Sequence, residues 1–286
     1  MMEETDPRGL IFDIEEFGIY DGPSIRTVVF LKGCPLRCMW CQNPEGWNPF
    51  PERMVSSRCI HCDTCKRVCP HKDKCIACGT CLPYCPVNAI SIAGEYMKAS
   101  ELADKILANE KLLRLNDGGV TFTGGECLTQ TDFVLAVIKR LNGLHTAIET
   151  SGYGDEKTFK KMIEAVDLVM FDIKQTDPLI HKRYIGVDNV LIKRNLDNLI
   201  ASHKPFIARI PVIPGVNDNE KNYQETVNWL KGATNLDHVE LLPYNRSAGA
   251  KYQMLKLIYK PTFDEKADPF IDLEVFAKAG IKAKVM

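Results

Sequence analysis

The chain has 286 residues, of which 45% are hydrophobic, and this size predicts one large α/β domain with room for a small insert. Its 36 basic and 37 acidic residues give a net charge of −1, which argues against partners such as nucleic acid or an anionic membrane surface. No apolar run approaches the ~20 residues of a membrane-spanning helix, and the acidic N-terminus does not resemble a signal peptide, so we expect a soluble, cytoplasmic monomer.

Six mostly apolar runs predict strands that are buried on both faces. In chain order they are residues 27–33, 119–125, 146–152, 167–174, 206–215 and 238–245. Helical periodicity lies between them, and Ser100 is placed to cap the first helix. The predicted helices are residues 100–113, 131–141, 155–166, 189–202 and 219–233. This repeated strand–helix order favours a parallel sheet, closed or partly closed, with its site at the carboxyl ends of the strands.

A loop directly after the first predicted strand reads KGCPLRCMWCQNPEG, and it brings together Cys34, Cys38 and Cys41. Three cysteines can hold a cubane iron–sulfur cluster in which one iron keeps an open coordination position. An open position distinguishes a reactive metal site from a structural one. The alternative is a zinc knuckle whose fourth ligand is Cys59 or Cys127, although Cys127 fits better as a buried free thiol.

The segment 54–95 interrupts the strand–helix pattern and contains eight of the twelve cysteines. Disulfides are rare in a reducing compartment, and tight clustering is typical of metal ligands. The spacing CxxCxxCxxxCP occurs twice, as in ferredoxins, where the fourth cysteine of each run ligates the other cluster. Crossed pairing predicts one [4Fe–4S] cluster on Cys59, Cys62, Cys65 and Cys85, and another on Cys69, Cys75, Cys78 and Cys81.

Two alternatives for this segment stay open. Zinc sites that use His61 or His71 are one, although zinc motifs usually show paired rather than triple cysteine runs. The other is a distorted or single-cluster insert, because only residues 70–74 separate the two runs.

The stretch FGIYDGPSIRTVVFLKGCPLRCMWCQNPE resembles the N-terminal signature of the glycyl-radical-enzyme activating enzymes of the radical S-adenosylmethionine (SAM) superfamily. TFTGGE, ETSGY, MFDIK, RIPVIPGVND and ELLPYN resemble the later motifs of this family, in order. The resemblance covers most of the chain and weakens after about residue 250. It implies an α/β fold, a partial (β/α)6 TIM-like barrel formed by residues 1–53 and 96–286, with residues 54–95 as an inserted ferredoxin-like iron–sulfur domain.

The resemblance also implies a function. SAM would bind the open iron of the first of three [4Fe–4S] clusters. One-electron cleavage would then yield methionine and a 5′-deoxyadenosyl radical that removes a hydrogen from a glycine of a partner glycyl radical enzyme. The protein must orient SAM and exclude competing reactions. The insert would relay electrons from a ferredoxin or flavodoxin, under anaerobic conditions.

The same resemblance assigns residues to the site. Glu126 would accept hydrogen bonds from the SAM ammonium group, and Lys174 would contact the SAM carboxylate. Arg209 lies in an apolar strand and therefore needs a carboxylate partner, either SAM or an internal acid. The expected SAM contacts are Trp40, Gly124, Gly125, Glu126, Thr150, Ser151, Lys174, Arg209 and Asn245. A monovalent cation would lie at Glu149, Thr150 and Asp172, and the glycyl loop of the partner would meet Asp21 and Arg26.

Three other functions compete with this hypothesis: a radical SAM enzyme acting on a small molecule, an iron–sulfur electron carrier, and a structural zinc protein. The electron-carrier hypothesis leaves the three-cysteine loop and the GGE motif without a role. Analysis of iron and sulfide distinguishes the zinc hypothesis from the others.

Overall fold

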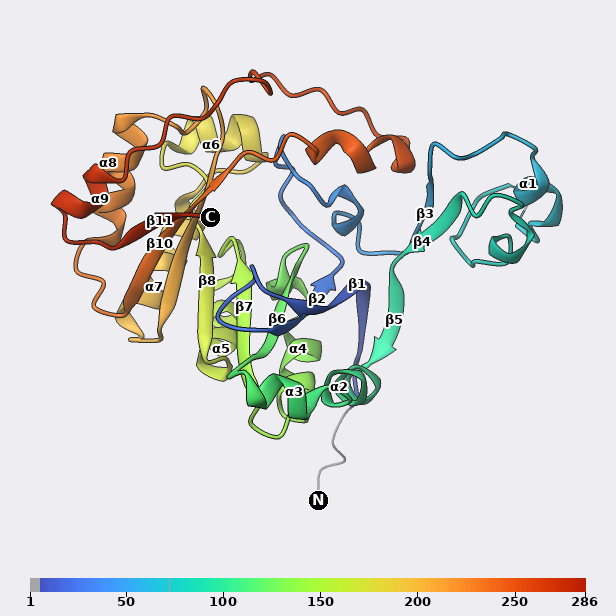
Figure 1. Cartoon of the computed structure of the whole chain (residues 1–286), viewed down its shortest axis with the longest axis horizontal. Helices are drawn as coiled ribbons and strands as arrows, with labels where there is room; N and C mark the ends of the chain where they lie inside the picture. Colours follow the sequence, from blue (N-terminus) through green and yellow to red (C-terminus); the bar gives the residue numbers. More distant parts are fainter. Residues whose placement is uncertain (1–5, 72) are drawn as a thin grey trace.

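A computed structural model describes residues 6–71 and 73–286. Its main sheet has nine strands in the order β11-β10-β9-β8-β7-β6-β2-β1-β5, and the run from β2 to β11 is parallel throughout. These parallel strands are β2 (Arg26–Leu31), β6 (Gly119–Gly124), β7 (His145–Thr150), β8 (Leu168–Asp172), β9 (Phe206–Val212), β10 (Leu236–Pro243) and β11 (Ala283–Val285). The predicted α/β class with a mostly parallel sheet is therefore confirmed (Figure 1).

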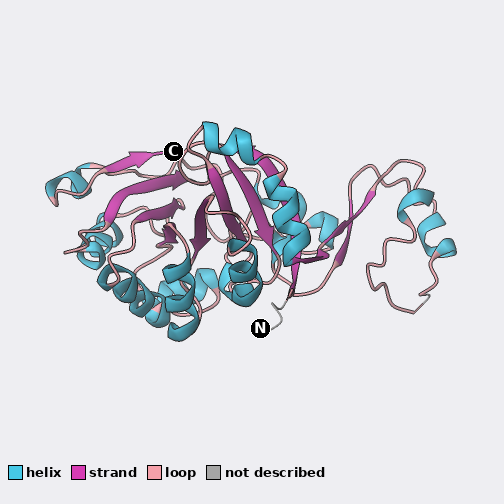
Figure 2. Ribbon diagram, turned by 90° about the horizontal axis from the view of Figure 1, so that it is seen from below, coloured by secondary structure: helices cyan, strands magenta, loops and turns pink. Residues whose placement is uncertain are grey.

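The sheet is open, with β5 and β11 at its two edges. Two antiparallel strands, β1 (Arg8–Gly18) and β5 (Glu95–Lys98), extend it beyond β2. Neither was predicted, because β1 mixes buried residues with the exposed acids Glu15 and Glu16, and β5 is only four residues long. Most helices gather along one side of the sheet (Figure 2). No described helix is long and apolar enough to cross a membrane.

Helices connect the parallel strands in the predicted order, although several of them are shorter than predicted. In α5 (Glu156–Ala165), Asp155 caps the helix by accepting from the Thr158 N–H at 3.0 Å, and Phe159 lies in the core. The others are α2 (Ala99–Leu107), α3 (Glu110–Leu115), α4 (Thr131–Ile138), α6 (Pro178–Ile185), α7 (Val190–Ala201), α8 (Glu220–Leu230) and α9 (Glu274–Lys278). Of these, α6 and α9 are short helices that were not predicted.

The first predicted helix is corrected in two ways. It begins at Ala99 with Lys98 in the cap position, where Glu101 accepts from the Lys98 N–H at 2.8 Å. Ser100 does not cap it, because its hydroxyl donates to Asp6 at 2.8 Å. The predicted span 100–113 is also divided into α2 and α3, which are separated by two residues.

The cysteine-rich segment leaves the main sheet through a two-stranded antiparallel ribbon. The ribbon pairs β3 (Glu52–Val55) with β4 (Ile90–Ala93), with Val55 opposite Ile90. Between them the chain forms α1 (Thr64–Val68) and a 3₁₀ turn, η2 (Leu82–Tyr84). This segment projects away from the main sheet (Figure 1).

Candidate functional site

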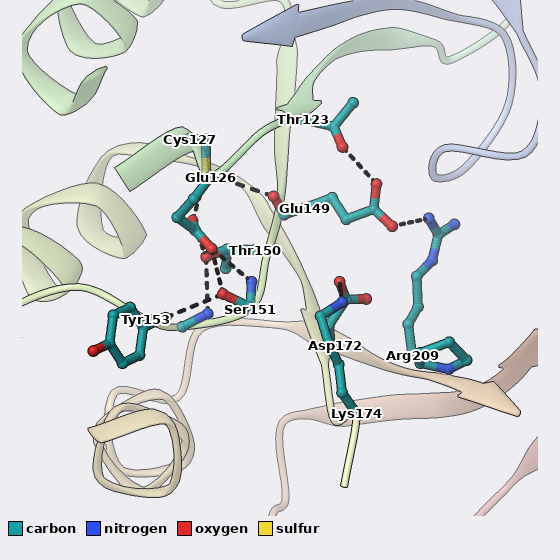
Figure 3. Close-up of polar contacts among 12 residues, drawn as sticks. Thr123, Glu126, Cys127, Glu149, Thr150, Ser151, Tyr153, Asp172, Lys174 and Arg209 are labelled. Carbon is teal, nitrogen blue, oxygen red and sulfur yellow. Dashed lines mark hydrogen bonds and ion pairs between the residues drawn. The ribbon is translucent and has the colours of Figure 1, made fainter. Parts of the chain in front are cut away.

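A cavity of about 510 Å³ lies where the carboxyl ends of the parallel strands meet the three-cysteine loop. The lining brings together residues that are far apart in the sequence, as parallel strands do when they end at one edge. They are Cys34, Cys38, Cys41, Trp40, Gly124, Gly125, Glu126, Glu149, Thr150, Ser151, Asp172, Lys174 and Asp21. Figure 3 shows how the polar residues among them converge from β6, β7 and β8.

The cysteine loop is held by backbone hydrogen bonds at both of its ends. The Cys34 N–H donates to the Trp47 carbonyl at 3.0 Å, and the Met39 N–H donates to Tyr184 in α6 at 2.9 Å. Burial raises the pKa of the Cys38 thiol to about 12, and it also raises the pKa of Cys34 and Cys41. Metal binding must therefore displace the protons of these thiols.

The three cysteines of the loop border the same space. Cys34, Cys38 and Cys41 line one cavity, so three thiolates would face the same bound group. Among the described residues, no three His, Cys, Asp or Glu side chains are pre-assembled around one metal ion. The iron–sulfur and zinc assignments of this loop both stay predictions.

Gly124 and Gly125 allow the end of β6 to pass close to the root of the cysteine loop. A Cβ at Gly124, whose φ is 106°, would lie 2.6 Å from the Leu31 nitrogen, and a Cβ at Gly125 would lie 2.5 Å from the Gly33 carbonyl oxygen. The Glu126 N–H donates to that Gly33 carbonyl at 2.8 Å. The two glycines thus fix the position of Glu126 relative to the cysteines.

The Glu126 carboxylate is buried, and residues at the end of β7 hold it in place (Figure 3). It accepts from the Thr150 hydroxyl at 2.5 Å, from the Ser151 hydroxyl at 2.5 Å and from the Ser151 N–H at 2.9 Å. Three predicted site residues, Glu126, Thr150 and Ser151, are therefore joined through this one carboxylate. Cys127, which follows it, is fully buried, as expected for a free thiol.

Arg209 is paired with two internal acids. Its guanidinium lies 2.9 Å from Glu149 and 2.8 Å from Glu240, and it also donates to the Tyr20 carbonyl. Burial alone would raise the pKa of both glutamates, but the charge of Arg209 and the hydrogen bonds to each carboxylate together lower both pKa values. The internal-acid alternative accounts for this buried arginine in the structure, and its contact with SAM remains a prediction.

Asp172 and Lys174 form an ion pair of 2.7 Å at the end of β8. The strand ends at Asp172, so Lys174 lies beyond it and is not bound by the alternation of faces along a strand; both side chains line the same cavity. Burial and the charge of Glu149 raise the pKa of Asp172, although Lys174 opposes the shift. Asp172 and Glu149 of the predicted cation site therefore lie close together, and each already has a cationic partner.

A second cavity of about 360 Å³ adjoins the first and shares Asp21, Trp40 and Glu149 with it. Trp40 is buried and packs edge-on against Phe263, with ring centroids 6.5 Å apart. Asn245 lines only this second cavity, and its side chain donates to Gln42 at 3.2 Å. Asp21 lines both cavities, so it lies where the two adjoin.

The prediction for Arg26 needs correction. Arg26 is fully buried, and its guanidinium donates to the Thr121 hydroxyl at 2.6 Å and to the Val120 carbonyl at 2.7 Å. It cannot contact a partner protein in this conformation. Asp21 remains accessible in both cavities, and Arg26 contributes by holding the neighbouring backbone.

Asp21 provides a test by pH. Its pKa is raised to about 6, because burial and the Glu149 carboxylate disfavour its charge more than Arg209 favours it. Ionised Asp21 therefore destabilises the fold above about pH 6, and this cost disappears as the pH falls toward the ordinary pKa of 3.8. We expect Asp21→Asn to be more stable than wild type at pH 7–8, on the order of 1–2 kcal/mol after allowance for solvent screening, but not at pH 4. Urea unfolding at both pH values measures this, and an equal difference at both would contradict it.

Two residues that contact Glu149 or Arg209 were not predicted from the sequence. Thr123 donates to Glu149 at 2.6 Å, and Glu240 pairs with Arg209. Each lies within a strand of apolar character, so its polar side chain was the available signal.

The cysteine-rich segment forms its own cavity of about 640 Å³. Its lining includes Cys59, Cys62, Cys65 and Cys85, which is the first ligand set of the crossed pairing. The guanidinium of Arg53 lies 3.6 Å from the Cys65 sulfur.

Comparison with known proteins extends the observations on the site. Residues 28–227 match the Radical SAM superfamily. The chain is 37% identical over 277 residues to a (2S)-3-sulfopropanediol dehydratase activating enzyme of Klebsiella oxytoca, covering 89% of this chain and 87% of that protein. It is 37% identical over 271 residues to a choline trimethylamine-lyase activating enzyme of Oleidesulfovibrio alaskensis, covering 87% of each chain.

Two further matches agree with these. A 4-hydroxyphenylacetate decarboxylase activating enzyme of Clostridioides difficile is 34% identical over 292 residues, covering 94% of this chain and 91% of that protein. The crystal structure of a radical SAM methyltransferase from Sphaerobacter thermophilus matches with a TM-score of 0.52 and 14% identity, covering 92% of this chain and 68% of that chain. At this identity the match reports on the fold alone.

Proposed function

The chain belongs to the radical SAM superfamily and, within it, to the activating enzymes of glycyl radical enzymes, and from this premise we propose how its residues serve that function. When bound, a [4Fe–4S] cluster and SAM supply reductive cleavage to methionine and a 5′-deoxyadenosyl radical, which takes a hydrogen from a glycine of the partner. The observation that supports our assignment is one cavity that combines three cysteines with Glu126, Lys174 and Asp172.

We assign the cluster to Cys34, Cys38 and Cys41, with the fourth iron position reserved for SAM. Lys174 is placed to bind a carboxylate, because it faces the same cavity as the cysteines. The Glu126 carboxylate would attract the SAM ammonium group by charge, while Thr150 and Ser151 orient it. Gly124 and Gly125 hold this strand end close to the cysteine loop.

Further contacts follow from the adjoining cavity. Trp40 and Asn245 would line the path of SAM, and Arg209 would act there by fixing Glu149. Glu149, Thr150 and Asp172 would hold a monovalent cation. Asp21 would meet the partner's glycyl loop where the second cavity opens.

We propose that residues 54–95 form a ferredoxin-like insert with two further [4Fe–4S] clusters. The common cavity of Cys59, Cys62, Cys65 and Cys85 supports the first set, and Cys69, Cys75, Cys78 and Cys81 would form the other. A ferredoxin or flavodoxin would supply electrons to a monomeric enzyme. Free cysteines on this scale suit a reducing compartment such as the cytoplasm.

The proposed function is tested by anaerobic incubation with SAM, a reductant and a panel of glycyl radical enzymes. The panel includes dehydratases, lyases and decarboxylases of the kinds that its relatives activate. We expect an EPR signal of a glycyl radical with one of them, and a Gly→Ala variant of that partner as control should give none. Turnover of SAM on a small molecule without any partner would instead favour a different radical SAM enzyme.

A further inference from the structure

Two short 3₁₀ turns near the end of the chain lie between the two cysteine cavities. They are η4 (Ala248–Lys251) and η5 (Gln253–Leu255). Lys251 lines the cavity of the three-cysteine loop, whereas Gln253 and Met254 line the cavity of the insert. One continuous stretch of four residues therefore borders both cavities, and the orange-red turns lie next to the root of β3 (Figure 1).

On one side, Lys251 anchors this stretch to the cysteine loop. Its ammonium group donates to Asn43 at 2.9 Å and forms an ion pair with Glu45, and both of these residues follow Cys41 in the chain. Glu45 is buried, and its second carboxylate oxygen has no hydrogen-bond partner in the described part of the chain. Lys251 therefore supplies the positive charge that pairs with the buried Glu45 carboxylate at the edge of the loop.

Tyr252 continues this contact. It is buried, and its ring packs at right angles to that of Trp47, with centroids 5.5 Å apart. The Trp47 carbonyl in turn holds the Cys34 N–H.

On the other side, the insert is tied to the same region. Met254 and Gln253 share their cavity with Cys59, Cys62, Cys65 and Cys85. The root of the insert is fixed by Lys32, which is buried, pairs with Glu52 at 2.8 Å and donates to the Glu45 carbonyl. A 3₁₀ turn rises about 2 Å per residue along its axis, so Tyr252 and Met254 are separated by only ~4 Å along the axis of the turn.

We propose that residues 251–254 form the junction across which one electron passes from the insert to the three-cysteine loop, and that the Lys251–Glu45 ion pair holds this junction in place. The inference rests on the proposed function. Cys59, Cys62, Cys65 and Cys85 would hold the cluster that donates the electron, and Cys34, Cys38 and Cys41 would hold the cluster that accepts it. A low-potential one-electron donor protein resupplies the insert, and no bond forms or breaks in this transfer.

The test follows cluster reduction in the intact enzyme loaded with all of its iron, without measuring turnover. Reduced flavodoxin is mixed with the enzyme, and freeze-quench EPR records when each cluster becomes reduced. We expect Lys251→Met and Tyr252→Leu to slow reduction of the loop cluster at least several-fold, while the insert is reduced at the wild-type rate. Lys251→Arg, which keeps the charge, should restore the wild-type rate.

Lys260→Met is the matched control, because Lys260 is exposed and lies outside both cavities. Equal rates of loop-cluster reduction in wild type, Lys251→Met and Tyr252→Leu would overturn the junction. If Lys251→Met loses iron, the junction is tested by the other two variants: Tyr252→Leu should still slow reduction of the loop cluster, and Lys251→Arg should not. Dithionite is small enough to reduce the loop cluster directly, so it tests the proposed function separately from the junction. If the wild type forms no 5′-deoxyadenosine with dithionite and SAM, the proposed function itself is overturned.

Discussion

Replacing Cys34, Cys38 and Cys41 together by alanine should abolish the formation of 5′-deoxyadenosine from SAM while leaving the iron of the insert bound. The three thiols line the only part of the described site cavity that offers sulfur ligands, and the insert's cysteines line a separate cavity. Liquid chromatography of the SAM products, together with iron and sulfide analysis, measures both effects. Because the chemistry needs the cluster, we expect activity to fall below detection rather than to decrease gradually.

Cys127→Ala is the matched control for this experiment. Cys127 is also buried, but it lies behind Glu126 and outside the lining of the cavity. Its replacement should retain SAM cleavage and the full iron content. Normal SAM cleavage by the triple variant would contradict the assignment of the loop, and loss of iron from the insert in the same variant would contradict the separation of the two sites.

Arg209→Met should destabilise the protein by about 3–5 kcal/mol, because it removes the cation that Glu149 and Glu240 share and leaves Glu240 with only the half-exposed Lys284. The Arg209 and Glu240 side chains are each only 4% exposed, so water cannot replace the lost contact. The midpoint of anaerobic urea unfolding measures the change. The hydrophobic replacement keeps most of the volume, so the effect reports on charge.

The same variant carries a pH signature. In the wild type Arg209 lowers the pKa of both glutamates, so their contribution to stability is present above the ordinary pKa of 4.5 and is lost as the pH falls through the lowered value. Without Arg209, burial raises both pKa values, and the variant should recover stability when the pH is lowered from 8 to 5. A deficit that is constant across this range would contradict the charge explanation.

Arg246→Met provides the control for Arg209. Arg246 forms a 2.7 Å ion pair with Asp268, but the two side chains are 58% and 94% exposed. An exposed pair of this kind contributes ~0–1 kcal/mol, so the same substitution should change the unfolding midpoint little. A loss comparable to that of Arg209→Met would show that the arginine side chain, rather than its burial with two acids, determines the effect.

The parallel strands and the helices between them could be predicted from the sequence because their signals are local. Apolar runs such as residues 167–174 and caps such as Asp155 depend on neighbours a few residues away. The strands β1 and β5 were not predicted because β1 mixes buried residues with exposed acids and β5 is only four residues long, so neither has a clear local pattern.

For the site, the sequence by itself predicted which residues would form the reactive loop, since Cys34, Cys38 and Cys41 lie within eight residues. Only the tertiary structure decided which distant groups pair. In the folded structure the Ser151 hydroxyl donates to Glu126, Arg209 pairs with Glu240, and Arg26 is buried. The tertiary structure also placed residues 251–254 between two cysteine cavities. Such contacts form between strand ends and loops that are distant in the sequence. The residue pattern of a single segment does not show which other segments will contact it.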